Sequence, residues 1–128
     1  MIHSATLRNT IALAVEAAIN LGSAGGKIKA RSGSTPGAGT LLATWTLDVD
    51  AGSVSGPTIT FTTFPNEVNA VADGTIGNIE ITDSDDTVCL QTADVGTGAN
   101  QGAFSSLTTV NGAPVRLNSM TYTVPAGT

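Results

Sequence analysis

The chain has 128 residues and a formal net charge of −5, with 41% hydrophobic residues but only 4% aromatic ones. This length suits one domain that buries its own core, and the single cysteine excludes an intrachain disulfide and a CxxC metal knuckle. The acidic balance disfavours nucleic-acid binding, because the chain as a whole repels a polyphosphate.

An amphipathic helix is predicted over residues 4–21. Its apolar stripe, at helical spacing, consists of Leu7, Ile11, Val15, Ala18 and Ile19. Ser4 is a good N-cap residue, and Gly22 suits the end of a helix. The stripe must pack either on the chain's own sheet or on a neighbouring subunit, and the sequence leaves both open.

The rest of the chain, residues 26–128, predicts an antiparallel β-sandwich or jelly roll of about seven or eight short strands. The helical period is lost after residue 26, and short alternating runs are separated by turn residues. The predicted strands are residues 27–31, 40–48, 58–64, 68–72, 78–82, 87–92, 107–110 and 115–124. We expect one domain, 1–128, in which residues 22–26 join the helix to the sandwich.

Three positions carry expectations about burial. Trp45 lies in the clearest alternating run and is predicted to anchor the core. Glu67 and Glu80 are expected to be solvated, because acidic side chains are seldom buried.

The sequence contains no evident catalytic constellation. His3 is the only histidine and lies beside the N-terminus, a poor place for a preorganised site. Asp83, Asp85 and Asp86 suggest calcium, but their loop lacks the further oxygen ligands and the spacing of an EF-hand. A solvated hairpin tip is favoured, and cation binding there is left open. We therefore expect no enzyme activity and no catalytic, cofactor or metal site.

Charge is distributed unevenly along the chain. Residues 1–31 carry a net +3 and the remainder carries −8. A basic end on a polar, weakly charged body suits docking on an acidic protein surface. The expected partner-contact residues are Arg8, Lys27, Lys29 and Arg31.

Four segments, taken in order, resemble a group of small proteins encoded in the structural gene clusters of tailed bacteriophages. They are residues 6–12, 26–36, 39–47 and 115–127, and together with a central segment, 78–88, they are distributed along most of the chain, from residue 6 to residue 127. The central segment departs from the group's pattern because it lacks an aromatic residue and is more acidic.

The resemblance implies a virion component, most simply a capsid decoration or cement protein that binds the major capsid protein or other virion proteins. Such proteins commonly act as dimers or trimers, so a homo-oligomer is expected. No signal peptide or membrane span is predicted, since the apolar run at 11–21 is short and interrupted. The expected location is the virion, after synthesis in the host cytoplasm.

Two alternatives remain open. One is a tail or baseplate component, and the other is a carbohydrate-binding adhesion module. The second needs an exposed aromatic platform, for which Trp45 and Tyr122 are the candidates, although both lie in periodic strands where core positions are expected.

Overall fold

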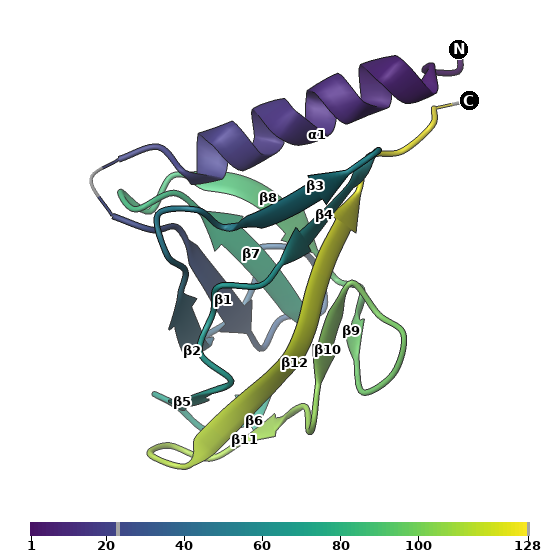
Figure 1. Ribbon diagram of the computed structural model, residues 1–128. Coiled ribbons are helices and arrows are strands. Elements are labelled where there is room, and N and C mark those ends of the chain that lie inside the picture. Colours follow the sequence, from purple (N-terminus) through teal and green to yellow (C-terminus); the bar gives the residue numbers. More distant parts are fainter. Residues whose placement is uncertain (23, 128) are drawn as a thin grey trace.

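The N-terminal segment forms one helix, α1 (Ala5–Ile19), in the computed structural model, which describes residues 1–22 and 24–127 (Figure 1). The Ser4 hydroxyl accepts a hydrogen bond from the Leu7 N–H at 3.1 Å, which confirms Ser4 as the N-cap. The helix ends at Ile19, two residues before the predicted end, and Gly22 then turns the chain with φ +104°. Two residues lie outside the described residues. They are residue 23, in the predicted connection, and residue 128, at the end of the predicted sandwich.

Four antiparallel strands form the first sheet, in the order β2-β1-β7-β8. Their bounds are β1 (Lys27–Arg31), β2 (Leu41–Thr46), β7 (Asn78–Thr82) and β8 (Val88–Thr92). All four correspond to predicted runs, because each alternates or is apolar and is bounded by turn residues.

The second sheet has the order β3-β4-β12-β10-β9, and β5 pairs with the start of β12. Its members are β3 (Gly52–Ser55), β4 (Thr58–Phe61), β5 (Glu67–Asn69), β9 (Val95–Gly96), β10 (Gly102–Phe104) and β12 (Pro114–Thr123). All these pairs are antiparallel except β9 with β10. A small ladder joins β6 (Gly74–Thr75) to β11 (Thr108–Thr109).

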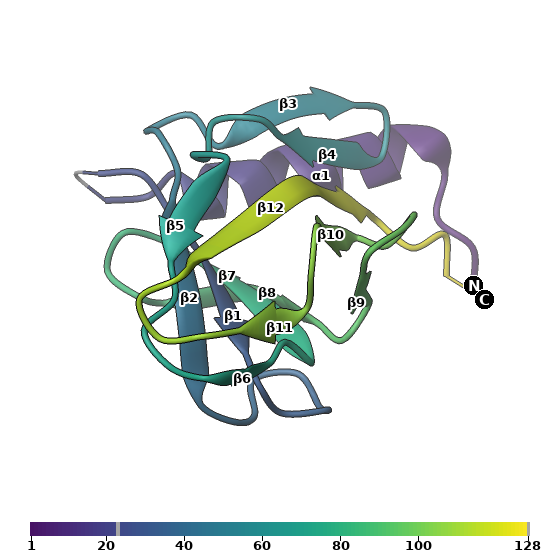
Figure 2. The same cartoon turned by 90° about the horizontal axis from the view of Figure 1, so that it is seen from below.

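The two sheets face each other across one apolar core, as a β-sandwich does (Figure 2). Trp45 on β2 is fully buried and meets Phe104 on β10, with ring centroids 5.7 Å apart. The predicted core anchor is therefore confirmed, and it joins the two sheets directly. The mainly β fold with one N-terminal helix is confirmed as well.

Helix α1 packs on its own sandwich, where it contacts β3, β4 and β8 (Figure 1). Ala12 and Ile19 are fully buried against the core, whereas Leu7 is 46% exposed. The predicted stripe is thus wrong at its first member, and Ala12 takes a core position because a small side chain allows the helix to approach the sheet closely. The choice between the chain's own sheet and a neighbour is decided for its own sheet.

Candidate interaction site

The predicted contact residues of β1 lie in a row on the outer face of the first sheet. Ile28 and Ala30 are fully buried, so the alternation of the strand directs Lys27, Lys29 and Arg31 to the opposite face. All three cations are half-buried among polar neighbours from β2 and β7. The structure therefore brings three of the four predicted residues together.

Both lysines of this row pair with one carboxylate in the β7–β8 turn. The Asp86 Oδ1 atom lies 3.0 Å from Lys27 Nζ and 2.9 Å from Lys29 Nζ. Hydrogen bonds from Lys29 and then Lys27 hold the pKa of Asp86 below its usual range. Asp86 has φ 66°, a left-handed conformation in which Asp is tolerated better than most residues. The turn is thus set so that one carboxylate bridges two cations.

Arg31 pairs with Glu80, which is only 4% exposed. Arg31 Nε donates to Glu80 Oε1 at 2.6 Å, and Gln91 Nε2 donates to Glu80 Oε2 at 3.1 Å. Burial acts to raise the pKa of Glu80, but these hydrogen bonds and the charges of Arg31 and Lys29 outweigh it and lower the pKa. The expectation that Glu80 is solvated is wrong, because a cation on the neighbouring strand compensates its burial. Glu67 is exposed, as expected.

Arg8 does not belong to this row. Its guanidinium donates twice to the backbone carbonyl of Val124, from Nε at 3.0 Å and from Nη2 at 2.8 Å. This contact ties α1 to the segment that follows β12, beside the two adjacent chain termini (Figure 1). Each of the four predicted contact residues therefore has a partner within the chain, and their role toward another protein stays a prediction.

In the acidic turn before β8, the Asp83 carboxylate binds the backbone of the turn itself. Asp83 Oδ1 accepts the backbone N–H groups of Asp85 at 2.9 Å and of Thr87 at 3.0 Å. These bonds close the turn, which is a common role for Asp. Among the described residues, no group of three or more His, Cys, Asp or Glu side chains could hold a metal ion.

A second acidic pair lies where α1 meets the loop before β3. Burial, and then the Asp50 carboxylate beside it, raise the pKa of Glu16. The nearby Asn20 side chain accepts the Ala51 N–H at 3.0 Å and so fixes this loop to the helix end. Like charges are thus held together here without a cation among the described residues.

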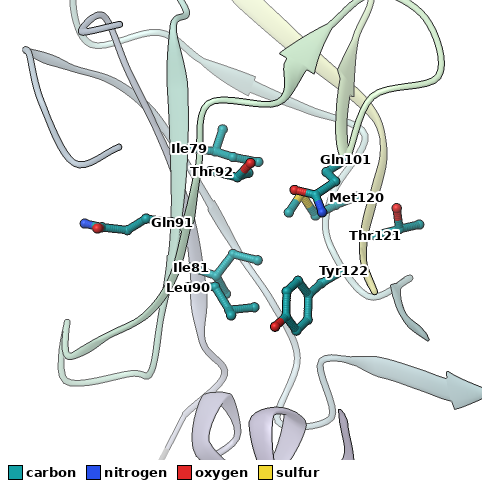
Figure 3. Close-up of a pocket in the computed structure, with 9 residues that line it drawn as sticks. All are labelled: Ile79, Ile81, Leu90, Gln91, Thr92, Gln101, Met120, Thr121 and Tyr122. Carbon is teal, nitrogen blue, oxygen red and sulfur yellow. The ribbon is translucent and has the colours of Figure 1, made fainter. Parts of the chain in front are cut away.

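An apolar cleft of about 80 Å³ opens between the two sheets beside β8 (Figure 3). From the first sheet, Ile79, Ile81, Leu90 and Thr92 line it; from the other side, Met120 and Tyr122 of β12 and Gln101, just before β10, do so. Gln91 and Thr121 also border it, but their side chains point away (Figure 3). The cleft is therefore a gap in the seam of the sandwich with an apolar floor and a few polar groups.

Sequence reasoning missed this cleft because the last strand changes face. Alternation predicts one face for residues 116, 118, 120, 122 and 124, but Val115 and Leu117 are buried as well as Met120. The pairing of β10 with β12 shifts register between Ala103 and Phe104. Beyond such an irregularity, the residues that point into the core are those that would otherwise point outward. Its only signal in the sequence is that the apolar residues alternate at odd positions in one half of the strand and at even positions in the other.

No helix in the described part of the chain is long and apolar enough to cross a membrane. Neither a scan against protein-family models nor searches of curated proteins and of solved structures find a match to this chain.

Proposed function

We propose that this chain is a non-enzymatic virion structural protein, most simply a capsid decoration protein that binds the outer surface of the capsid shell and stabilises it. The ordered resemblance of four segments to small phage structural proteins is the origin of the proposal. The observation that carries it is the packing of α1 on its own sandwich, with Ala12 and Ile19 fully buried. A protein added to an assembled shell must present a folded unit, and the chain's own strands cover the buried side of this helix.

The surface chemistry supports the same proposal. The chain has 20 Thr, 10 Ser and 15 Gly but only 15 charged residues, and each of its five cations has an intramolecular partner. A protein that is displayed in many copies benefits from multiplicity, because modest contacts become firm when they are repeated on a lattice.

The carbohydrate-binding alternative loses one of its two aromatic platforms. Trp45 is fully buried between the sheets and cannot stack on a sugar. Tyr122 is half-buried beside a cleft of about 80 Å³, which is small for a glycan unit. A tail or baseplate component differs from a decoration protein in copy number, so the number of bound copies per particle distinguishes the two roles.

The test is co-sedimentation of the purified protein with phage capsids assembled without it. Hundreds of bound copies per particle are expected for a decoration protein, with a raised temperature of capsid disruption. A saturating handful of copies would move the protein to the tail, and no binding would contradict the decoration role.

The predicted basic contact is tested in the same assay. The double variant Lys27→Gln/Lys29→Gln should bind capsids more weakly, whereas Asp86→Asn should bind more tightly because it frees both lysines. Arg116→Gln serves as the control, since Arg116 lies on the second sheet, is half-exposed and is 3.7 Å from Glu67 of the paired strand β5. Unchanged binding of the first two variants, with folding verified by circular dichroism, would reject this contact.

A further inference from the structure

Strand β8 is an edge of the first sheet. Its neighbour in the sheet is β7 alone, and within the described residues no backbone hydrogen bond joins Val88–Thr92 to any other segment. At the opposite edge of the same sheet, the Val71 N–H donates to the Leu42 carbonyl on β2 at 2.8 Å. Helix α1 contacts both β3 and β8, and β9 in the second sheet has only two residues. β8 therefore presents backbone groups that are free to pair with a further strand.

The apolar cleft lies directly beside this edge. Leu90 of β8 and Tyr122 of β12 line its two sides (Figure 3). A strand added to β8 would direct alternate side chains inward, toward the seam between the sheets. A volume of about 80 Å³ is roughly half that of an engineered apolar cavity of about 150 Å³ that accepts benzene. The cleft therefore suits one branched aliphatic side chain.

The ends of β8 are acidic, which defines the charge of the occupant. Asp85 is exposed in the turn before the strand, and Asp94 is exposed just after it. The Asp94 carboxylate accepts hydrogen bonds from Asn100 Nδ2 at 2.8 Å and from the Gln101 N–H at 3.3 Å, but neither donor is charged. Lys27 and Lys29 pair with Asp86 in the same turn, but among the described residues no ion pair involves Asp85 or Asp94. A strand with basic ends would therefore meet unneutralised carboxylates at both ends.

A second copy of this chain fits the edge poorly. Antiparallel pairing of two β8 strands would place Asp85 of one copy beside Asp94 of the other, and parallel pairing would place identical acids together. Either arrangement brings like charges into proximity, a common way in which edge strands avoid self-association.

We propose that β8 accepts an extended segment of a partner protein, with an aliphatic residue at its centre and Lys or Arg at its ends. Main-chain hydrogen bonds to β8 provide affinity, and the central side chain fills the cleft between Leu90 and Tyr122. Strand addition at β8 would supply the proposed function with an attachment surface and a partner of stated chemistry. Only the identification of that partner as a virion protein rests on the proposed function.

The direct test is an NMR titration of the full chain with a seven-residue peptide, Lys-Thr-Thr-Val-Thr-Thr-Lys. We expect amide shifts and slowed hydrogen exchange confined to β8 and the cleft residues. The same peptide with Glu at both ends should bind at least about tenfold more weakly, because like charges then face each other. A peptide with N-methylated backbone amides should lose binding, since it cannot complete the ladder.

Matched variants separate charge from fold. Asp85→Lys should weaken binding of the Lys-ended peptide by about tenfold. Asp48→Lys, a change at another exposed aspartate outside β8, should leave binding unchanged. The proposal is overturned by absence of shifts at millimolar peptide, by shifts outside β8 and the cleft, by equal binding of all three peptides, or by dimerisation of the protein through β8.

The two proposals fail separately. Capsid binding that persists in Asp85→Lys, with no binding of the Lys-ended peptide to the unmodified chain, would reject strand addition and leave the decoration role standing. Peptide binding at β8 by a protein that does not co-sediment with capsids would reject the decoration role and leave the strand-accepting edge standing.

Discussion

Replacement of Arg31 by methionine tests whether the buried Glu80 depends on its cation. Glu80 is 4% exposed, and its carboxylate is held by Arg31 at 2.6 Å and by Gln91 at 3.1 Å. Arg31→Met preserves much of the aliphatic side chain but removes the charge and one hydrogen bond. The carboxylate is then left in place with Gln91 and the nearby charge of Lys29.

The expected cost is a loss of about 2 kcal/mol in the free energy of unfolding near neutral pH. A hydrogen bond to a charged group contributes about 1.5–3 kcal/mol. Loss of one partner from a fully buried ion pair costs about 3–5 kcal/mol. The lower range applies here, because the Arg31 side chain is 25% exposed and two other groups still face Glu80.

The pH dependence gives the sharper result. In the unmodified protein the pKa of Glu80 lies below its ordinary value of 4.5, so its stabilising contribution is present above that value and is lost as the pH falls through the folded-state pKa. Without Arg31, burial dominates and the pKa of Glu80 rises. The variant should therefore recover stability as the carboxyl becomes protonated, and its deficit should shrink between about pH 7 and about pH 4.

Urea unfolding across this pH range measures both effects, and Arg116→Met is the matched control. Arg116 and Glu67 are 3.7 Å apart with about half of each side chain exposed, so the control should cost less than about 0.5 kcal/mol. The reasoning is refuted if Arg31→Met costs no more than the control, or if its cost does not change with pH.

Three further changes give outcomes that urea unfolding can measure. Ile19→Ala should lower the free energy of unfolding by about 3 kcal/mol because Ile19 is fully buried. Leu13→Ala, at a position that is 51% exposed, should change it by no more than about 0.5 kcal/mol. Similar values for the two variants would contradict the packing of α1 on its own sandwich. Gly77→Ala should cost about 2 kcal/mol or more in the free energy of unfolding, because its Cβ would overlap the backbone of a neighbouring loop. Gly98→Ala places its Cβ in open space and should be near neutral. A tolerated Gly77→Ala would contradict the close approach of that loop. Burial and a neighbouring carboxylate raise the folded-state pKa of Glu16, so Glu16→Gln should raise the free energy of unfolding by about 0.2–1 kcal/mol near neutral pH. The effect should be small at a pH at which Glu16 is protonated. A loss of stability at neutral pH would show that the charge of Glu16 is favourable.

Local patterns predicted most of the secondary structure. Strands β1 and β7 have the predicted bounds, and β2, β4, β8 and β12 lie within or beside predicted runs. The short strands β3, β6, β9 and β10 were missed, because each contains glycine or has only two or three residues and carries no alternation of its own. Residues 96–102 lie in none of the predicted strands, yet Gly96 belongs to β9 and Gly102 belongs to β10. Such strands form because a neighbour supplies the hydrogen bonds, and the neighbour is distant in sequence.

The sequence by itself determined one helix, its N-cap at Ser4, a β-sandwich and the burial of Trp45, because local periodicity, capping and turn chemistry act over a few residues. Only the tertiary structure decided that Glu80 is buried beside Arg31, that β12 changes its inward face, and that a cleft opens beside β8. Each of these depends on which strands become neighbours and in what register. Strand pairing joins residues far apart in the chain, so no local pattern encodes it.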